Sequence, residues 1–384
     1  MVNQIIITTL FIIASVQFIP IFGEISSTRK GQIEFAVALI KEIGQNDKSI
    51  ISSPISISSG IFMLYLAADS ETKEELEEFF GRFGVTEEVE QNFDELLESI
   101  AAERNNYSLT ISNRLYIREG FSIQPSFIDT LQHYFNETVH YFTYNRKDQL
   151  IQEINNWASG NTNRRIKRFG TDIISPKTEM LVLSTFHFSG AWKNQFIDSE
   201  TSNTLFHLSE DKTKVVPMML LRAELPYYQD SFVQVVKLPY VGDEVEMIII
   251  LPQIRFDLSN IRKKMTGKDL IKYINWTNST NVELTLPKFG TETKLDLESV
   301  LRKFGITYIF SNYADFTELS SDSISVSNII HSSSFKATEK GTGTAIRTKY
   351  NPALNTFATF EADQPFLYFV VKDSNTVLYA GQYC

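Results

Sequence analysis

Helical patterns fill the first half of this 384-residue chain, and strand patterns fill the second half. Apolar residues recur at helical spacing in residues 33–43, 57–68, 72–80, 127–134 and 150–157, and the second of these segments is apolar nearly all round. Alternating patterns predict strands at residues 180–188, 232–238, 245–251 and 282–286, and a hairpin over residues 366–380. Helices first and strands later predict an α+β architecture with sizeable sheets.

The chain has a single cysteine, Cys384, at its last position. An intramolecular disulfide is therefore impossible, and we expect a large apolar core to supply the stability, which this length permits. Cys384 is either a stray thiol or a residue that pairs with another chain. No glycine- or proline-rich linker, repeat or low-complexity tract divides the sequence, so one large domain is the simplest interpretation.

An apolar run at residues 5–14 follows a short polar start and is typical of a secretory signal. The run is too short for a comfortable membrane span. We expect cleavage after Gly23, which gives a signal peptide of residues 1–23 and a secreted, extracellular domain of residues 24–384 that is not bound to a membrane. No Lys or Arg precedes the run, and the bulky Ile21 lies close to the cleavage point, so a retained anchor is the alternative. Four glycosylation sequons support secretion: Asn106, Asn136, Asn275 and Asn278.

The net charge is -10, which argues against nucleic acid as a partner, because such binding depends on neutralising phosphates with basic residues. The one basic cluster contains Arg164, Arg165, Lys167 and Arg168. We interpret it as a solvated helix end or loop rather than as a site for a polyanion.

The sequence contains no nucleophile elbow, no zinc-protease helix motif and no phosphate-binding loop. Gly341-Thr342-Gly343 begins like a dinucleotide motif, but Ile346 stands where its third glycine belongs. None of the five histidines has metal-ligand spacing, and His187 alternates within an apolar strand as a packed residue would. We therefore expect no metal, no cofactor and no enzyme activity, with a site assembled from distant residues as the alternative.

Short motifs occur in order through nearly the whole chain, from about residue 33 to residue 381. They are Ser53-Pro54-Ile55-Ser56, Ile154-Asn155-Asn156-Trp157, Thr162, Ile166, Phe188-Ser189-Gly190-Ala191-Trp192, Phe196, Thr201, Phe206, Val216-Pro217-Met218-Met219, Leu238-Pro239-Tyr240, Leu251-Pro252, Leu286-Pro287-Lys288-Phe289, Leu297, Gly305, Glu339-Lys340-Gly341-Thr342 and Pro365-Phe366. This ordered set resembles the serpins, the large protease-inhibitor superfamily. The resemblance implies a serpin fold of three β-sheets and about nine helices, with an exposed reactive-centre loop at about residues 339–364.

In inhibitory serpins the loop is offered to the target protease as a substrate. A protease attacks one loop bond, forms an acyl-enzyme and is carried away as the cut loop inserts into the central sheet as a new strand. The resemblance therefore implies a secreted inhibitor of a serine protease, acting as a monomer by this suicide-substrate route. The alternative is a non-inhibitory secreted serpin with a binding or immunomodulatory role.

The reactive bond lies near Leu354, Asn355 and Thr356. Counting forward from Glu339 with the family spacing gives Asn355-Thr356, and counting back from Pro365 gives Leu354-Asn355. A leucine suits a chymotrypsin- or elastase-like protease, and an asparagine suits an asparaginyl cysteine protease. We favour Leu354, because apolar specificity pockets are common, and the lack of Arg or Lys argues against trypsin-like targets.

The hinge that must insert first alternates in character. From Thr342 onward, one face receives β-branched or aromatic residues and the other receives small or hydrophilic ones, as in a half-buried strand. We expect Arg347 and Lys349, on the second face, to point into solvent. Thr344, Ile346 and Arg347 are bulkier than the small residues of inhibitory hinges, and the later Pro352 lacks the N–H that a central strand needs. The whole hinge comprises Glu339, Lys340, Gly341, Thr342, Gly343, Thr344, Ala345, Ile346 and Arg347.

The resemblance also places residues beneath the sheet opening: Ser53, Ser56, Ser184 and His331. An asparagine is usual at the position of Ser184. The shorter serine predicts a polar network that is rewired or filled with water, whereas a satisfied core serine is the alternative. Trp192 matches the aromatic residue where the loop enters the sheet, although packing alone would also explain a buried tryptophan.

Overall fold

The computed structural model describes residues 27–84, 89–102, 105–166, 168–342 and 357–384. The predicted signal peptide, the hinge from Gly343 onward and the three candidate reactive-bond residues lie outside the described residues. The hinge residues Glu339, Lys340, Gly341 and Thr342 lie inside them.

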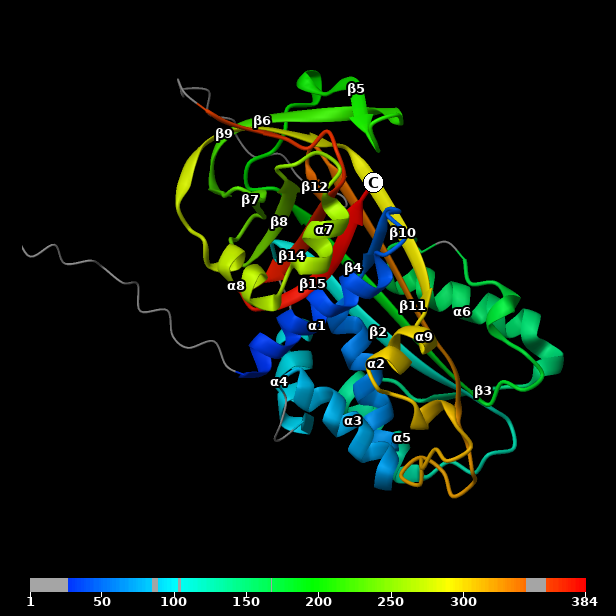
Figure 1. Ribbon diagram of the computed structural model, residues 1–384. Helices are drawn as coiled ribbons and strands as arrows, with labels where there is room; N and C mark the ends of the chain where they lie inside the picture. The colour runs from blue at the N-terminus through cyan, green and yellow to red at the C-terminus, as the bar shows by residue number, and fades with distance from the viewer. Residues whose placement is uncertain (1–26, 85–88, 103–104, 167, 343–356) are drawn as a thin grey trace, which may run out of the picture.

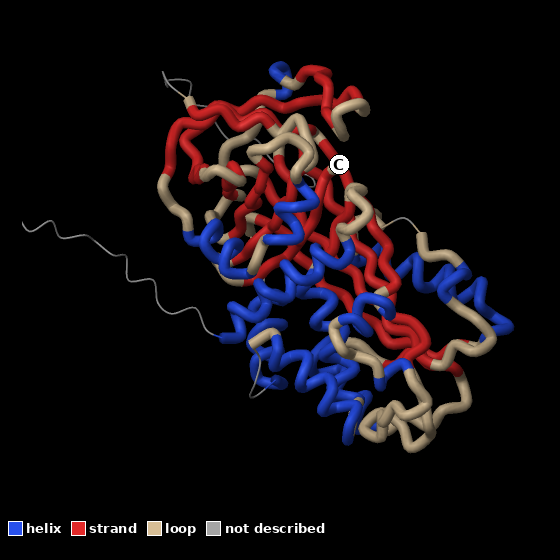
Figure 2. Tube along the Cα trace, viewed as in Figure 1, coloured by secondary structure: helices blue, strands red, loops and turns tan. Residues whose placement is uncertain are grey.

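Nine α-helices occur in the described part of the chain, and most of them gather at one end of the molecule (Figures 1 and 2). All five predicted helices are present, and the acidic helix α4 and the three short helices α7 to α9 are additional. The helices are α1 (Ser27–Ile43), α2 (Pro54–Ala67), α3 (Ser70–Arg82), α4 (Val89–Ala101), α5 (Pro125–Phe135), α6 (Lys147–Asn161), α7 (Leu258–Lys264), α8 (Gly267–Asn275) and α9 (Glu298–Lys303).

Helix α2 begins where its sequence dictates. The side chain of Ser53 caps the helix by accepting a hydrogen bond from the backbone N–H of Ser56, and Pro54 occupies the first turn, where its missing N–H costs nothing. Every residue of α2 is buried, as its all-round apolar pattern predicts. The helix therefore lies inside the molecule, and its capped N-terminus lies against the sheet described next.

The strands form a six-stranded sheet in the order β10-β11-β12-β4-β2-β3, and a nine-stranded sheet in the order β1-β15-β14-β8-β7-β6-β9-β13, with β5 paired to β6. Three sheets were expected, but hydrogen bonds join two of them, because the 17-residue β6 pairs with β7 at one end and with β9 along most of its length. The strands are β1 (Ile50–Ser52), β2 (Tyr107–Arg118), β3 (Val139–Phe142), β4 (Met180–Ala191), β5 (Ser202–His207), β6 (Thr213–Gln229), β7 (Val233–Pro239), β8 (Val245–Pro252), β9 (Ser279–Pro287), β10 (Phe289–Asp296), β11 (Val326–Thr338), β12 (Gly341–Thr342), β13 (Ala358–Glu361), β14 (Phe366–Lys372) and β15 (Thr376–Tyr383).

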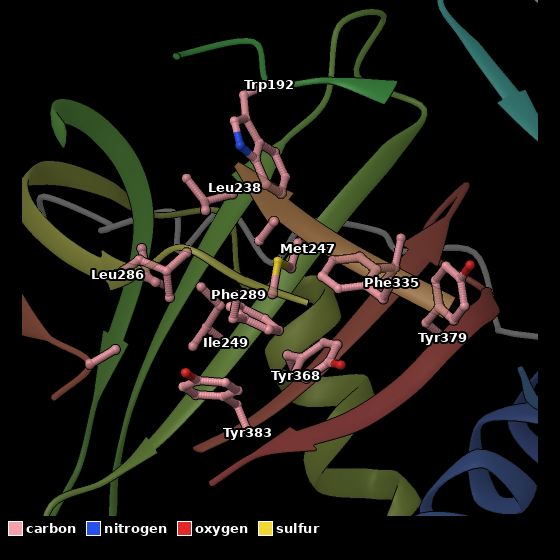
Figure 3. Packing of buried hydrophobic residues seen from close by; sticks show 14 of the residues in the cluster. Trp192, Leu238, Met247, Ile249, Leu286, Phe289, Phe335, Tyr368, Tyr379 and Tyr383 are labelled. Carbon is pink, nitrogen blue, oxygen red and sulfur yellow. The ribbon is translucent and has the colours of Figure 1, made fainter. Parts of the chain in front are cut away.

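A large aromatic core joins the inner faces of the two sheets (Figure 3). Phe335 of β11 packs against Tyr368 of β14 and Tyr379 of β15, with ring centroids 5.1 and 5.4 Å apart. Burial of each such side chain contributes roughly 1.5–3 kcal/mol. The core supplies the stability that the absence of disulfides requires.

Helix α6 covers part of the outer face of the six-stranded sheet. Ile154 and Trp157 of α6 belong to one buried cluster with Leu183 of β4 and Ile330 of β11. Around Leu183 and Ile330 the sheet is therefore covered on both faces, by the core on the inner face and by α6 on the outer face. The alternation of the strands alone does not reveal this.

Among the residues that the structure describes, no helix has the length and apolar character needed to cross a bilayer.

Candidate functional site

Strands β4 and β11 lie side by side and parallel at the centre of the six-stranded sheet. They pair from Met180 and Val326 to Phe186 and Ser333, and we call this pairing the seam. Because both strands run in the same direction, a single strand of opposite direction could pair with both of them at once.

Such a strand already lies just beyond one end of the seam, where β4 and β11 no longer pair with each other. After a turn at Glu339 and Lys340, β12 pairs antiparallel with both neighbours. Gly341 lies opposite Thr338 and Ala191, and Thr342 lies opposite Ala337 and Gly190. The first strand residues of the predicted reactive loop are thus built into the sheet.

The conformation of β12 requires its glycine. Gly341 has a φ of 143°, and a Cβ atom there would lie 2.1 Å from the carbonyl oxygen of Gly190. The next residue, Thr342, is buried, and its hydroxyl lies 2.6 Å from the hydroxyl of Tyr240. Burial raises the pKa of Tyr240 well above its usual value, so this hydroxyl stays protonated.

Trp192 holds the turn before β12. Its Nε1 donates to the carbonyl oxygen of Thr338 at 2.8 Å, and its backbone N–H donates to the carbonyl oxygen of Lys340 at 3.0 Å. Its ring also packs on Tyr240, with centroids 4.4 Å apart. Trp192 therefore has a specific structural task at the loop entrance besides filling the core (Figure 3).

Glu339 is fixed at the same turn. It pairs with Lys288 at 2.9 Å and accepts a hydrogen bond from the hydroxyl of Thr201 at 3.1 Å. Burial alone would raise the pKa of Glu339, but the hydrogen bonds, chiefly from Lys288, lower it overall. The carboxylate is thus charged at neutral pH and anchors the base of the loop.

Further down the seam, a chain of hydrogen bonds links α2 to β11 and β4. The backbone N–H of Ser53 donates to Nε2 of His331 at 3.0 Å, and Nδ1 of His331 lies 3.1 Å from Oγ of Ser184. Ser184 Oγ lies 2.8 Å from Ser56 Oγ, which donates to the carbonyl oxygen of Thr185 at 3.1 Å. His331 and Ser184 are direct partners across the seam.

The direction of this chain follows from its ends. Since Nε2 of His331 accepts the N–H of Ser53, the neutral ring carries its proton on Nδ1 and donates to Ser184. Ser184 can then donate to Ser56, which donates to Thr185. Complete burial lowers the pKa of His331 to about 3, so the ring is neutral at physiological pH.

The structure brings Ser53, Ser56, Ser184 and His331 into one network, and it places Trp192 apart from them at the loop entrance, beyond Phe186 and Ser333. Direct contacts satisfy Ser184, so the network is rewired around the serine. Tyr240 and Lys288 were not predicted as site residues, although both lie in the motifs Leu238-Pro239-Tyr240 and Leu286-Pro287-Lys288-Phe289.

The remaining predicted residues lie away from the seam network. Asn106, Asn136 and Asn278 are exposed and Asn275 is half-buried. His187 is a buried strand residue whose Nε2 lies 3.1 Å from Nδ2 of Asn163, and burial raises the pKa of the Cys384 thiol to about 12. No group of three or more His, Cys, Asp or Glu side chains within the described ranges is arranged to hold a metal ion.

Comparison with known proteins gives one consistent family. The model of the family described as "Serpin (serine protease inhibitor)" matches residues 30–384. Serpin B6 of Pongo abelii is 30% identical over 366 residues, covering 91% of this chain and 96% of the relative, and antichymotrypsin-2 of Bombyx mori is 28% identical over 361 residues, with the same coverage of each.

Solved structures show the same fold. Human thyroxine-binding globulin complexed with its hormone superposes with a TM-score of 0.85 at 24% identity, covering 92% of this chain and 97% of that one. Uncleaved ovalbumin gives a TM-score of 0.84 at 23% identity, covering 93% and 99%. The chain belongs to the serpin family.

Proposed function

We propose that this serpin inhibits serine proteases by inserting its cut reactive loop into the seam. The observation that carries the proposal is β12, which is already paired with both strands of the seam. Insertion would extend this strand rather than start a new one, so its first step avoids the cost of opening the sheet.

The proposed insertion extends the register of β12 along the sheet. Continued residue by residue, that register would bring Ile346 between Phe186 and Ser333, and Thr348 between Ser184 and His331. All four of these sheet residues are buried on the inner face. Ile346 would join the core, and the hydroxyl of Thr348 could replace the Ser184–His331 contact that insertion breaks.

Leu354 as the recognition residue makes a chymotrypsin- or elastase-like protease the proposed target. The name of the silkworm relative, antichymotrypsin-2, supports this choice. We further propose that the protein is secreted, as the apolar N-terminal run and the four sequons indicate.

One observation favours the second candidate function, a non-inhibitory binding or modulating protein. Extended in the same way, the register would bring Arg347 between Thr185 and Ser332, and Lys349 between Leu183 and Ile330. All four sheet residues are buried on the outer face, and α6 covers the last two. In such an inserted strand both cations would meet a covered face, whereas the sequence predicts that they face solvent; both residues lie outside the described part of the chain.

Burial of the two cations opposes complete insertion. The effective penalty for taking an unpaired charge out of water is several kcal/mol, although long side chains reduce it by reaching toward solvent. A slow loop would let the protease complete hydrolysis and leave. Thyroxine-binding globulin, solved with its hormone, shows that a ligand-binding protein also uses this fold.

A gel experiment separates the two functions. The protein is incubated with chymotrypsin, neutrophil elastase and cathepsin G, and the products are run on denaturing gels. A covalent complex that is absent with a protease lacking its catalytic serine supports inhibition. Clean cleavage of the loop by all three enzymes, without complex, supports the second function instead.

A further inference from the structure

A groove of about 630 Å³ lies beside strand β2, on the side of this strand that faces away from β4 and the seam. Residues of helices α4 and α5 and the end of α6 line it, and Leu109 to Asn113 of β2 form one side. The protease-trapping function described above does not use this groove.

The strand at this groove has an open edge. β2 pairs with β4 from Tyr107 to Ile117, but its other neighbour, β3, pairs only with Leu115 to Arg118. Over residues 109–113, no second strand is present in the described part of the chain.

The backbone direction identifies the groups at this edge. The N–H of Arg118 donates to Glu179, on the β4 side, and the N–H of Glu119 donates to Phe142, on the β3 side. Since successive residues of a strand point their N–H and C=O groups to opposite sides, Leu109, Ile111 and Asn113 direct theirs toward the groove. These groups form a template for an added strand.

The groove combines apolar surface with negative charge. Leu97, Leu109, Ile111, Tyr134 and Phe135 line it and are only half-buried. Helix α4 carries four acidic residues and no basic one, and its Asp94 and Glu98 line the groove.

The other charged groups that line the groove do not cancel this charge. Glu137 is already paired with Arg114 at 2.9 Å and with His140 at 3.2 Å. His133 lies 3.9 Å from Asp94 and is exposed, so solvent screens its interaction with the α4 wall. The wall formed by α4 therefore favours a cationic partner.

We propose that this groove binds an extended peptide segment of another protein, with alternating apolar and basic side chains, as a strand added to the edge of β2. The main-chain bonds would come from Leu109, Ile111 and Asn113. Alternate side chains would point to the apolar floor and to the acidic wall, as the period of two in a strand requires.

The probe is an amidated octapeptide of alternating lysine and valine that carries fluorescein at its N-terminus, with fluorescence anisotropy as the readout at low salt. We expect saturable binding, and none for the peptide in which glutamate replaces every lysine. Hydrogen exchange at single-residue resolution should show slower exchange for the amides of Leu109, Ile111 and Asn113. The amides of Thr110 and Ser112, which face β4, should not change.

A matched pair of variants isolates the acidic wall. Glu98→Gln should weaken binding about two- to fivefold, as expected for one exposed ion pair. Glu95→Gln removes an equal charge from the same helix, but Glu95 is not a lining residue, so binding should be unchanged.

The proposal would be overturned by no binding of the lysine peptide, by binding without protection of the three amides, or by equal weakening in the two variants. A concentration-dependent dimer that protects the same amides, and that the peptide does not displace, would identify a second copy of the chain as the occupant and also contradict it. Each result can be obtained whether or not the protein forms complexes with proteases.

Discussion

The entrance of the seam and its middle differ in how readily they would accept a third strand. At the entrance, β12 is already seated, and Trp192, Glu339 and Thr342 have their polar groups paired. In the middle, His331 and Ser184 bond directly across the gap, and α6 covers the outer face just beyond them. The seated β12 would therefore favour the start of insertion, whereas the Ser184–His331 contact and α6 would oppose its continuation.

The effect of each hinge residue on insertion therefore depends on which face of the sheet it would meet, and not on its size alone. Thr344 and Ile346 are bulkier than the residues of a typical hinge, yet in the proposed inserted strand they would face the inner, apolar core. In the same proposed strand, Arg347 and Lys349 would instead face the outer side, which α6 partly covers. We expect the outer-face cations, rather than the bulky inner residues, to set the speed of insertion.

The largest expected effect comes from closing the entrance. Thr342→Arg would place a charge beside Tyr240 in a fully buried position, so β12 should leave the sheet. The increase in Tm that follows loop cleavage should disappear entirely, as measured by calorimetry. Lys340→Arg, at an exposed neighbouring position, should keep the full increase. If the Thr342 variant also keeps it, the register is incorrect.

Removal of the central obstacle should have the next largest effect. In the double variant Arg347→Ala and Lys349→Ala, no cation is buried beneath α6, so the fraction of protease trapped as complex should rise several-fold on quantified gels. Lys336→Ala changes an exposed cation of β11 and serves as the control. An unchanged fraction in the double variant would show that the outer face does not limit insertion.

The seam network can be tested at its middle member. Ser184→Ala removes the link between His331 and Ser56 and leaves the buried Nδ1 of His331 without a partner, while Ser56 keeps its bond to Thr185. We expect the free energy of unfolding to fall by about 1–3 kcal/mol in urea titrations. Ser189→Ala, on the same strand but only half-buried, should change it by less than about 0.5 kcal/mol. Equal effects would argue against the network.

The smallest predicted effect is on pH dependence. The pKa of His331 is lowered to about 3 in the fold, so between pH 6.5 and that value the unfolded chain binds a proton that the folded chain does not. Stability from this residue is complete above pH 6.5 and declines as the pH falls. From pH 6.5 to 5 the contribution of His331 should fall by about 1–2 kcal/mol, so the total loss of stability should be smaller by that amount in His331→Gln. A separate loss should persist there, because burial also lowers the pKa of His187 to about 4. The exposed His133→Gln should retain the full loss.

The sequence predicted those features that depend on periodicity. The buried helix α2, the long strands and the α+β class follow from apolar spacing, and the seam residues Ser53, Ser56, Ser184 and His331 follow from the family resemblance. Helix α4 was missed, although its apolar residues Val89, Phe93 and Ile100 are buried at helical spacing.

Other features depend on tertiary contacts that no local pattern contains. The two-residue β12 is too short to produce a strand pattern in the sequence. Its position in the sheet depends on pairing and close backbone contact with Gly190, which is distant in sequence. Alternation assigned Arg347 and Lys349 to the outer face but could not show that α6 covers that face. The joining of two expected sheets depends on the pairing of β6, which a strand pattern does not specify.

The most direct test of the account is the melting temperature before and after a single cut in the loop near Leu354. If the severed segment becomes an additional strand between β4 and β11, the cut protein must melt at a clearly higher temperature than the intact one. Equal or lower melting of the cut protein would contradict the account, because it would mean that the seam takes up no residue beyond β12.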